Sequence, residues 1–171
     1  LEEAEASYKQ AIALKPDLAE AHSNLGVTLQ EMGRLEEAEA SYKQAIALKP
    51  DFAKAYFNLG NAQQELGRLE EAEASYKQAL KIKPDYAEAY NNMGNALKDK
   101  GDLEAAIESY KQALKIKPNY AEVYYNMANA LQDKGNPESA IDSYKHATKI
   151  KPDYAEAYHN MSLVNLSLQD F

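Results

Sequence analysis

The strongest constraint on the fold is a period of 34 residues that runs through the whole chain. It is clearest over residues 87–120, a stretch that nearly matches its neighbours when it is shifted by its own length. Five of the six prolines mark the same period: Pro16, Pro50, Pro84, Pro118 and Pro152. A fixed period of this size is typical of repeat architectures, in which each repeat is a small structural unit that stacks on its neighbours.

Within each period, apolar residues recur at the three- and four-residue spacing of an α-helix. We expect helices over 1–14, 19–32 and 35–48, with the same alternation continuing to 155–168. Glycine follows most first helices, where a left-handed residue closes a helix, and proline follows the second helices. Pro137 fits as well, because it lies in the first turn of its helix, where the missing N–H costs nothing. The pattern predicts five first helices (A), five second helices (B) and no strands.

Small residues indicate how the two helices of a pair touch. With Ala87 as position 1 of a 34-residue numbering, position 8 holds glycine in three units, and alanine or serine in the others. Glycine inside a helix costs about 1 kcal/mol relative to alanine, so its recurrence indicates a close approach of helix B. We expect the tyrosines at positions 4 and 24 to fill the space between the helices.

The repeat resembles the tetratricopeptide repeat family of helix–turn–helix units. The residues that carry the resemblance are Tyr90, Met93, Gly94, Leu97, Ala106, Tyr110, Ala113 and Pro118. It implies an all-α fold, a right-handed α-solenoid or superhelix of antiparallel helix pairs. We therefore expect one array over 1–171, with complete repeats at 19–52, 53–86, 87–120 and 121–154, a half repeat (helix B) at 1–18 and a half repeat (helix A) at 155–171.

Composition narrows the possible functions. The net charge of −8 disfavours binding to the phosphate backbone of nucleic acids. The absence of cysteine suits a reducing compartment, and no apolar run approaches the length of a membrane span. We expect a cytoplasmic protein that contacts neither nucleic acid nor membrane. The chain opens within a repeat, so we interpret it as a fragment of a longer protein.

Asparagine occupies position 6 in every unit, although its amide competes with the helix for backbone hydrogen bonds. Positions 2, 6, 9 and 13 lie opposite the apolar positions of helix A, and the resemblance implies that this side lines a concave groove for extended peptides. A carboxamide can pair with both the C=O and the N–H of a peptide backbone. The candidate peptide-binding residues are Asn24, Asn58, Asn92, Asn126, Asn160, Asn61, Asn95, Asn129, Phe57 and Tyr125.

The asparagine row is also compatible with two origins that involve no ligand, and both stay open. Residues 1–17 and 35–51 are identical, so recent duplication explains some of the sameness. A hydrogen bond between neighbouring repeats would also keep asparagine in place. In favour of ligand binding, the row is similar to the asparagine-lined repeats of O-linked N-acetylglucosamine transferase, which hold substrate backbone.

We expect a scaffold that binds protein or peptide, and no catalysis, metal or cofactor. The histidines lack metal-ligand spacing, and the carboxylates form rows instead of an isolated pair. Acidic residues at positions 2 and 13, with Lys54 and Lys98 as exceptions, favour basic or neutral peptides. One alternative is a substrate-docking segment of a larger enzyme, such as a glycosyltransferase. Another is a scaffold that assembles head to tail through its two half-repeat ends.

Overall fold

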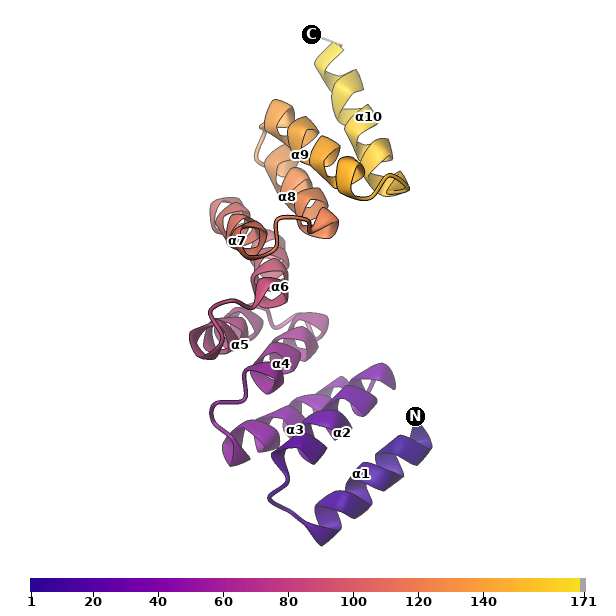
Figure 1. The fold of residues 1–171 in the computed structure, drawn as a ribbon, viewed down its shortest axis with the longest axis vertical. Helices are drawn as coiled ribbons and strands as arrows, with labels where there is room; N and C mark the ends of the chain where they lie inside the picture. The colour runs from indigo at the N-terminus through magenta and orange to yellow at the C-terminus, as the bar shows by residue number, and fades with distance from the viewer. Residues whose placement is uncertain (170–171) are drawn as a thin grey trace. The chain divides into compact units, whose positions relative to one another are not determined.

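The structure, a computed structural model, describes residues 1–169, and these residues form ten helices and no strand (Figure 1). The helices are α1 (Glu2–Leu14), α2 (Ala19–Glu31), α3 (Leu35–Leu48), α4 (Ala53–Glu65), α5 (Leu69–Ile82), α6 (Ala87–Asp99), α7 (Leu103–Ile116), α8 (Ala121–Asp133), α9 (Pro137–Ile150) and α10 (Ala155–Gln169). Consecutive helices form antiparallel pairs, so the predicted all-α fold is confirmed. None of these helices combines the length and the apolar character needed to cross a membrane.

The helices fall into two compact units. Unit 1, Leu1–Asp85, holds α1 to α5, and unit 2, Tyr86–Phe171, holds α6 to α10. In each unit every helix packs on the next one in sequence, and the closest packing is between the A and B helices of one repeat. The A helices of adjacent repeats also touch, α2 with α4 and α6 with α8. Each unit therefore presents its own row of A helices.

Glycine closes four of the A helices in the way the sequence predicts. Gly33, Gly67, Gly101 and Gly135 have φ between +74° and +86°. At the end of α2, the N–H of Arg34 donates to Leu29 O, and that of Gly33 donates to Gln30 O, both at 2.9 Å. This pair of bonds satisfies carbonyls that the helix end would otherwise leave open. A side chain at the glycine would cost roughly 1–2 kcal/mol in this conformation.

Pro137 begins α9, as predicted, because a helix has no internal use for its first N–H groups. The preceding Asn136 caps this helix by accepting a hydrogen bond from the Ser139 N–H at 3.3 Å. Asp102 caps α7 in the same way through the Ala105 N–H, at 3.1 Å. These caps fix where the two B helices of unit 2, α7 and α9, start relative to the glycine turn before each of them.

A tyrosine at position 24 forms the centre of each A–B interface. The four tyrosines of the complete repeats are fully buried: Tyr42, Tyr76, Tyr110 and Tyr144. In three repeats the ring covers the glycine at position 8, and a β-carbon placed on Gly94 would lie 2.5 Å from Cε1 of Tyr110. The close approach predicted from the small residues is therefore present.

The tyrosines at position 4 are less buried than those at position 24. Tyr56, Tyr90 and Tyr124 are only half-buried, and Tyr158 is 47% exposed. Tyr124 packs against the core cluster around Tyr144, and its ring also stacks on the exposed His146 at the edge of the repeat. The position 4 rings cover the rim of the helix pair, whereas position 24 supplies its core.

Candidate functional site

The predicted binding residues lie in two rows on the A helices. Positions 6 and 9 are three residues apart, which places them on the same helix face one turn from each other. Unit 1 carries them on α2 and α4, and unit 2 carries them on α6, α8 and α10. Asn24 is exposed, Asn58 is buried, and the remaining asparagines of both rows are half-buried.

The position 9 row is tied to the core by the buried tyrosines. The hydroxyl of Tyr110 donates to Asn95 Oδ1 at 2.7 Å, and that of Tyr144 donates to Asn129 Oδ1 at 2.5 Å. The same bond joins Tyr76 to Asn61 in unit 1, at 2.9 Å. Each bond directs the amide oxygen toward the core, because the hydroxyl can donate only to that atom. The Nδ2 group of the same amide is then turned away from the tyrosine.

The position 6 row of unit 2 connects adjacent A helices. Asn126 on α8 donates through Nδ2 to Asn91 Oδ1 on α6, at 3.0 Å. Asn160 on α10 donates through Nδ2 to the Tyr125 hydroxyl and to Asn129 Oδ1 on α8, both at 3.2 Å. These bonds are the inter-repeat hydrogen bonds that the sequence left open as a reason for the row. They use the amide donors of position 6 and not its Oδ1 acceptors.

The amide network is incomplete in unit 1. The partner positions on α2 hold Ser23 and Val27, and Asn58 Nδ2 is buried without a hydrogen-bond partner. An unpaired buried donor costs roughly 1–3 kcal/mol, so this part of the row is less stable than its counterpart. Asn92, in unit 2, accepts a hydrogen bond from Asn91 Nδ2 at 3.1 Å.

The two aromatic candidates at position 5 pack on the core tyrosines. The ring centroid of Phe57 lies 6.1 Å from that of Tyr76. Tyr125 lies 6.0 Å from Tyr144 and 5.0 Å from Tyr154. Both rings remain half-buried, so each offers one apolar edge beside the asparagine rows.

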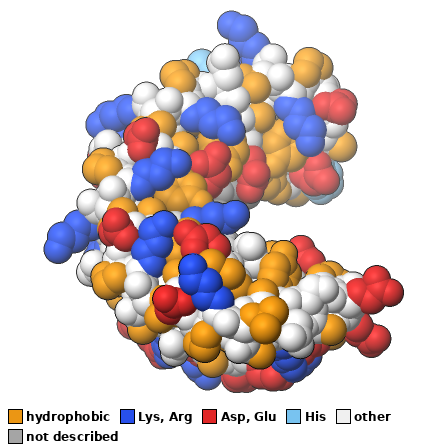
Figure 2. All heavy atoms as spheres, turned by 60° about the horizontal axis from the view of Figure 1, so that its bottom comes forward, with side chains coloured by type: hydrophobic (Ala, Val, Ile, Leu, Met, Phe, Trp, Pro, Cys, Tyr) orange, Lys and Arg blue, Asp and Glu red, His pale blue; other side chains and the backbone are white. Residues whose placement is uncertain are grey.

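Lysines partly neutralise the acidic residues that flank the rows. Glu20 pairs with Lys49 at 3.2 Å, and Glu88 lies 3.7 Å from Lys117. The pKa of Glu20 is lowered by its own backbone N–H and by Lys49. These lysines were not predicted from the sequence, although the partners in both pairs are separated by the same 29 residues. Figure 2 shows the same mixture, with basic and acidic side chains interspersed on the face it draws.

A second set of ion pairs links the B helices α1 and α3 of unit 1 to the N-cap residues of the next B helices. Arg34 contacts Glu5 at 2.9 Å, and Arg68 contacts Glu39 at 2.6 Å. Glu39 is buried and also pairs with Lys43 at 2.8 Å. Burial would raise the pKa of the Glu39 carboxyl, but the hydrogen bond and charge of Lys43 outweigh it and hold the pKa below its ordinary value. These contacts serve stability and lie apart from the asparagine rows.

Within residues 1–169, no three His, Asp or Glu side chains are close enough together to hold a metal ion. The ring Nε2 of His22 lies 3.0 Å from Pro16 O, so it donates to a turn carbonyl. His146 stacks on Tyr124.

Comparison with known proteins places this arrangement among repeat proteins. Models described as TPR repeat match residues 1–33, 29–67, 65–101 and 94–135, and a model described as tetratricopeptide repeat matches residues 121–154. A search of curated proteins found no match.

Solved structures with the same fold include proteins called MamA. A crystal structure of MamA superposes with a TM-score of 0.82 at 27% identity, covering 89% of this chain and 89% of that chain. MamA 41-end from Desulfovibrio magneticus RS-1 superposes with a TM-score of 0.83 at 18% identity, covering 90% of this chain and 87% of that chain. The second likeness concerns the fold alone.

Proposed function

Because the chain belongs to the tetratricopeptide repeat family, we propose that it is a non-catalytic scaffold whose A-helix face binds extended polypeptide. The binding residues in this proposal are the asparagines of positions 6 and 9, with Phe57 and Tyr125 beside them. The observation that carries it is the opposite orientation, in unit 2, of the amides of Asn95 and Asn129 at position 9 and those of Asn126 and Asn160 at position 6.

The two rows offer complementary groups to a peptide backbone. The core tyrosines bind the Oδ1 atoms of Asn95 and Asn129, which leaves their Nδ2 donors to meet peptide C=O groups. Asn126 gives its Nδ2 to the neighbouring helix, which leaves its Oδ1 acceptor to meet a peptide N–H. A peptide residue carries one donor and one acceptor, so a pair of rows of this kind matches backbone without reading side chains.

This mode of binding is weak and tolerant of sequence. Packed helices lie about 8–10 Å apart, and an extended chain advances about 3.3 Å per residue, so roughly every third peptide residue meets an asparagine pair. Each hydrogen bond contributes about 0.5–1.5 kcal/mol, and ordering the peptide opposes it. We expect dissociation constants in the micromolar range or weaker.

Charge sets a preference for neutral or basic peptides. Acidic residues flank the rows at positions 2 and 13, although Lys49 and Lys117 partly neutralise those at position 2. An acidic ligand would meet like charge at this surface. The preference is therefore expected to be moderate and to decrease with salt, because exposed charges are screened.

The sharpest test replaces a donor and keeps the acceptor. Asparagine to aspartate at Asn95 and Asn129 retains an oxygen for the tyrosine hydroxyl and removes the NH2 group. Binding of a fluorescently labelled neutral peptide, followed by anisotropy in moderate salt, is expected to weaken about tenfold in the double variant, with unchanged circular dichroism. Binding that stays as tight as in the wild type would reject the role of the position 9 row.

A matched control separates this effect from added charge. Asn119 lies in the exposed turn before α8 and belongs to neither asparagine row. The variant Asn119→Asp adds a negative charge outside the rows and is expected to bind the neutral peptide as the wild type does. The same surface would serve if the chain is a substrate-docking segment of a larger enzyme, so the peptide test applies to that alternative as well.

Assembly through the ends is a second candidate function, and one comparison within the chain favours it. Helices α1 and α3 have the same sequence from Glu2 and Glu36 onward, but Tyr42 of α3 is fully buried whereas Tyr8 of α1 is half-buried. An A helix would cover Tyr8, either one that precedes residue 1 in a longer chain or α10 of a second molecule. Sedimentation at increasing concentration tests this, and a Tyr8→Asp variant would abolish any association through α1. A chain that remains monomeric at high concentration would count against end-to-end assembly.

A further inference from the structure

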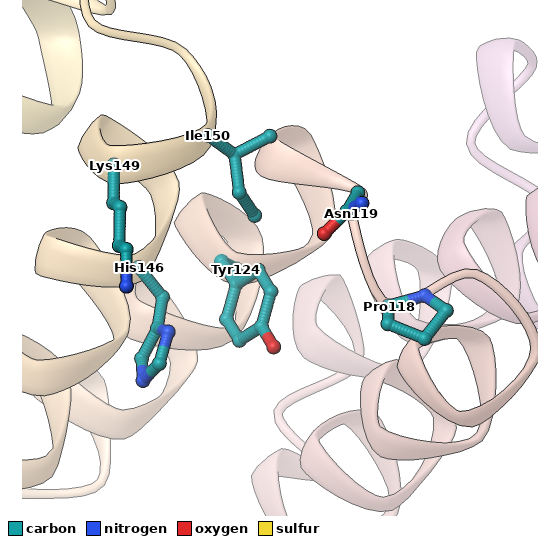
Figure 3. Close-up of a pocket in the computed structure, with 6 residues that line it drawn as sticks. All are labelled: Pro118, Asn119, Tyr124, His146, Lys149 and Ile150. Carbon is teal, nitrogen blue, oxygen red and sulfur yellow. The ribbon is translucent and has the colours of Figure 1, made fainter.

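One hollow of unit 2 lies away from both asparagine rows. It measures about 490 Å³ and is lined by Pro118 and Asn119 from the turn before α8, Tyr124 from α8, and His146, Lys149 and Ile150 from α9. Figure 3 shows the side chains of α9 on one side and the turn on the other, with the Tyr124 ring between them.

The floor of the hollow is aromatic. The rings of Tyr124 and His146 are nearly parallel, at 16°, with centroids 5.0 Å apart. Ile150 lies beside the Tyr124 ring in Figure 3, and Pro118 adds a second apolar wall. A flat or branched apolar group can rest on such a surface, because stacking on a ring face contributes beyond simple burial.

Lys149 gives the hollow a positive charge. Lys149 is exposed and forms no ion pair among residues 1–169. The amide of Asn119 and the hydroxyl of Tyr124 also open onto the hollow (Figure 3). The acid nearest in sequence on α9, Asp142, lies 3.5 Å from Lys145 and is therefore paired. An anionic group would find a cation on the α9 side of the hollow, across the Tyr124 ring from Asn119.

Comparison with the equivalent positions of the other repeats shows which residues of the hollow are unusual. The position of Asn119 is aspartate in every other unit, at Asp17, Asp51, Asp85 and Asp153. The position of His146 is glutamine in every other unit, at Gln10, Gln44, Gln78 and Gln112. Among the repeats, only this one therefore has asparagine in place of the aspartate and a histidine ring in place of the glutamine.

The geometry points to a binding site for a carboxylate attached to a planar or branched apolar group. The carboxylate pairs with Lys149, and the apolar part rests on Tyr124. Such a group occurs in a small organic acid and in a polypeptide in which an acidic residue follows an aromatic one. This site is independent of the peptide-binding surface proposed above, because it shares no residue with it.

Two-dimensional amide NMR of the intact chain tests the site with matched probes. Benzoate represents a small acid and benzamide is its uncharged counterpart. A blocked phenylalanyl-glutamate dipeptide represents a polypeptide, and its phenylalanyl-glutamine analogue is the control. We expect a carboxylate probe to shift the amides of Tyr124, His146 and Lys149, with binding about fivefold tighter than that of its uncharged partner. The tighter of benzoate and the dipeptide identifies the source.

Two variants complete the test. Lys149→Gln removes the cation, and Asn119→Asp restores the acid found in the other repeats, so both are expected to fold. Each should weaken carboxylate binding about fivefold or more. Aspartate at Asn95 should leave carboxylate binding unchanged, which keeps this result distinct from that of the peptide test. Equal shifts from acid and amide probes, or full binding by Lys149→Gln, would overturn the proposal.

Discussion

The hydroxyl of Tyr110 donates a hydrogen bond to Asn95 Oδ1 across 2.7 Å, and this bond joins the core of a repeat to its surface row. Burial raises the pKa of Tyr110, so the hydroxyl keeps its proton and remains a donor at neutral pH. The same pairing occurs between Tyr144 and Asn129. Asparagine at position 9 therefore has a structural partner, and that partner also determines which amide atom faces outward.

Removing the Tyr110 hydroxyl should destabilise the repeat and leave the Asn95 amide free to rotate. We expect Tyr110→Phe to lower the free energy of unfolding by about 1 kcal/mol, because Asn95 loses its partner but can turn to water. Urea denaturation followed by circular dichroism measures the change. Tyr90→Phe is the matched control, since its ring is half-buried at the rim, and it should change stability by less than half as much. Equal effects of the two variants would contradict the assignment.

Gly94 should not tolerate a methyl group. Alanine favours the helix by about 1 kcal/mol, but its β-carbon would lie 2.5 Å from Cε1 of Tyr110, and such crowding costs about 1–3 kcal/mol. We expect Gly94→Ala to be destabilising by about 1 kcal/mol in total. Ser162→Ala changes the same repeat position on α10, where the side chain is exposed, and should be close to neutral. A stabilised Gly94→Ala variant would show that the two helices separate easily.

Acid should weaken unit 1 through Glu39. Its pKa is below the ordinary value in the folded chain, so the unfolded chain binds the proton more readily. The stabilisation is therefore present at neutral pH and is lost as the pH falls through the lowered pKa. Glu39→Gln should cost about 1–3 kcal/mol at neutral pH, and less as the solution becomes acidic. Urea denaturation at a series of pH values tests this, with exposed Glu36→Gln as control. If the cost of Glu39→Gln does not change with pH, Glu39 is not the source of the acid sensitivity.

Alkali should unfold the repeats through the buried tyrosines. Burial raises the pKa of Tyr144 to about 12, above its ordinary value near 10.0. A raised folded pKa means that the contribution to stability is complete below the ordinary value and is lost as the pH rises through about 12. Tyr144→Phe should therefore be less stable than the wild type at neutral pH, and the gap should narrow in alkali. Tyrosine absorbance reports ionisation of the phenol, and circular dichroism recorded together with it reports unfolding. A Tyr144 phenol that ionises while the chain stays folded would contradict this expectation.

The sequence was sufficient for the local structure because local chemistry determines it. Gly33 closes α2 with a positive φ, and Pro137 begins α9, as their residue types require. The contact of Gly94 with Tyr110 was predictable from the small residue alone. Each of these features depends on one residue type and on its place in the 34-residue period.

The side-chain pairings were not predictable in the same way. The bond from Tyr110 to Asn95 spans 15 residues and depends on how two helices cross, which periodicity does not fix. The pair of Arg68 with Glu39 joins neighbouring repeats, so it requires the offset between them. Tyr90 is half-buried, and the sequence pattern did not distinguish its position from the fully buried position 24. The role of the asparagine rows in binding stays a prediction.

The central claim is that the asparagine rows bind peptide backbone and not side chains. Anisotropy would compare one labelled neutral peptide with a scrambled version and with a version N-methylated at alternate residues, which lacks those N–H donors. We expect the scrambled peptide to bind within about threefold of the original, and the N-methylated peptide to bind about tenfold more weakly. If scrambling abolishes binding while N-methylation leaves it intact, the surface recognises side chains and the claim is wrong.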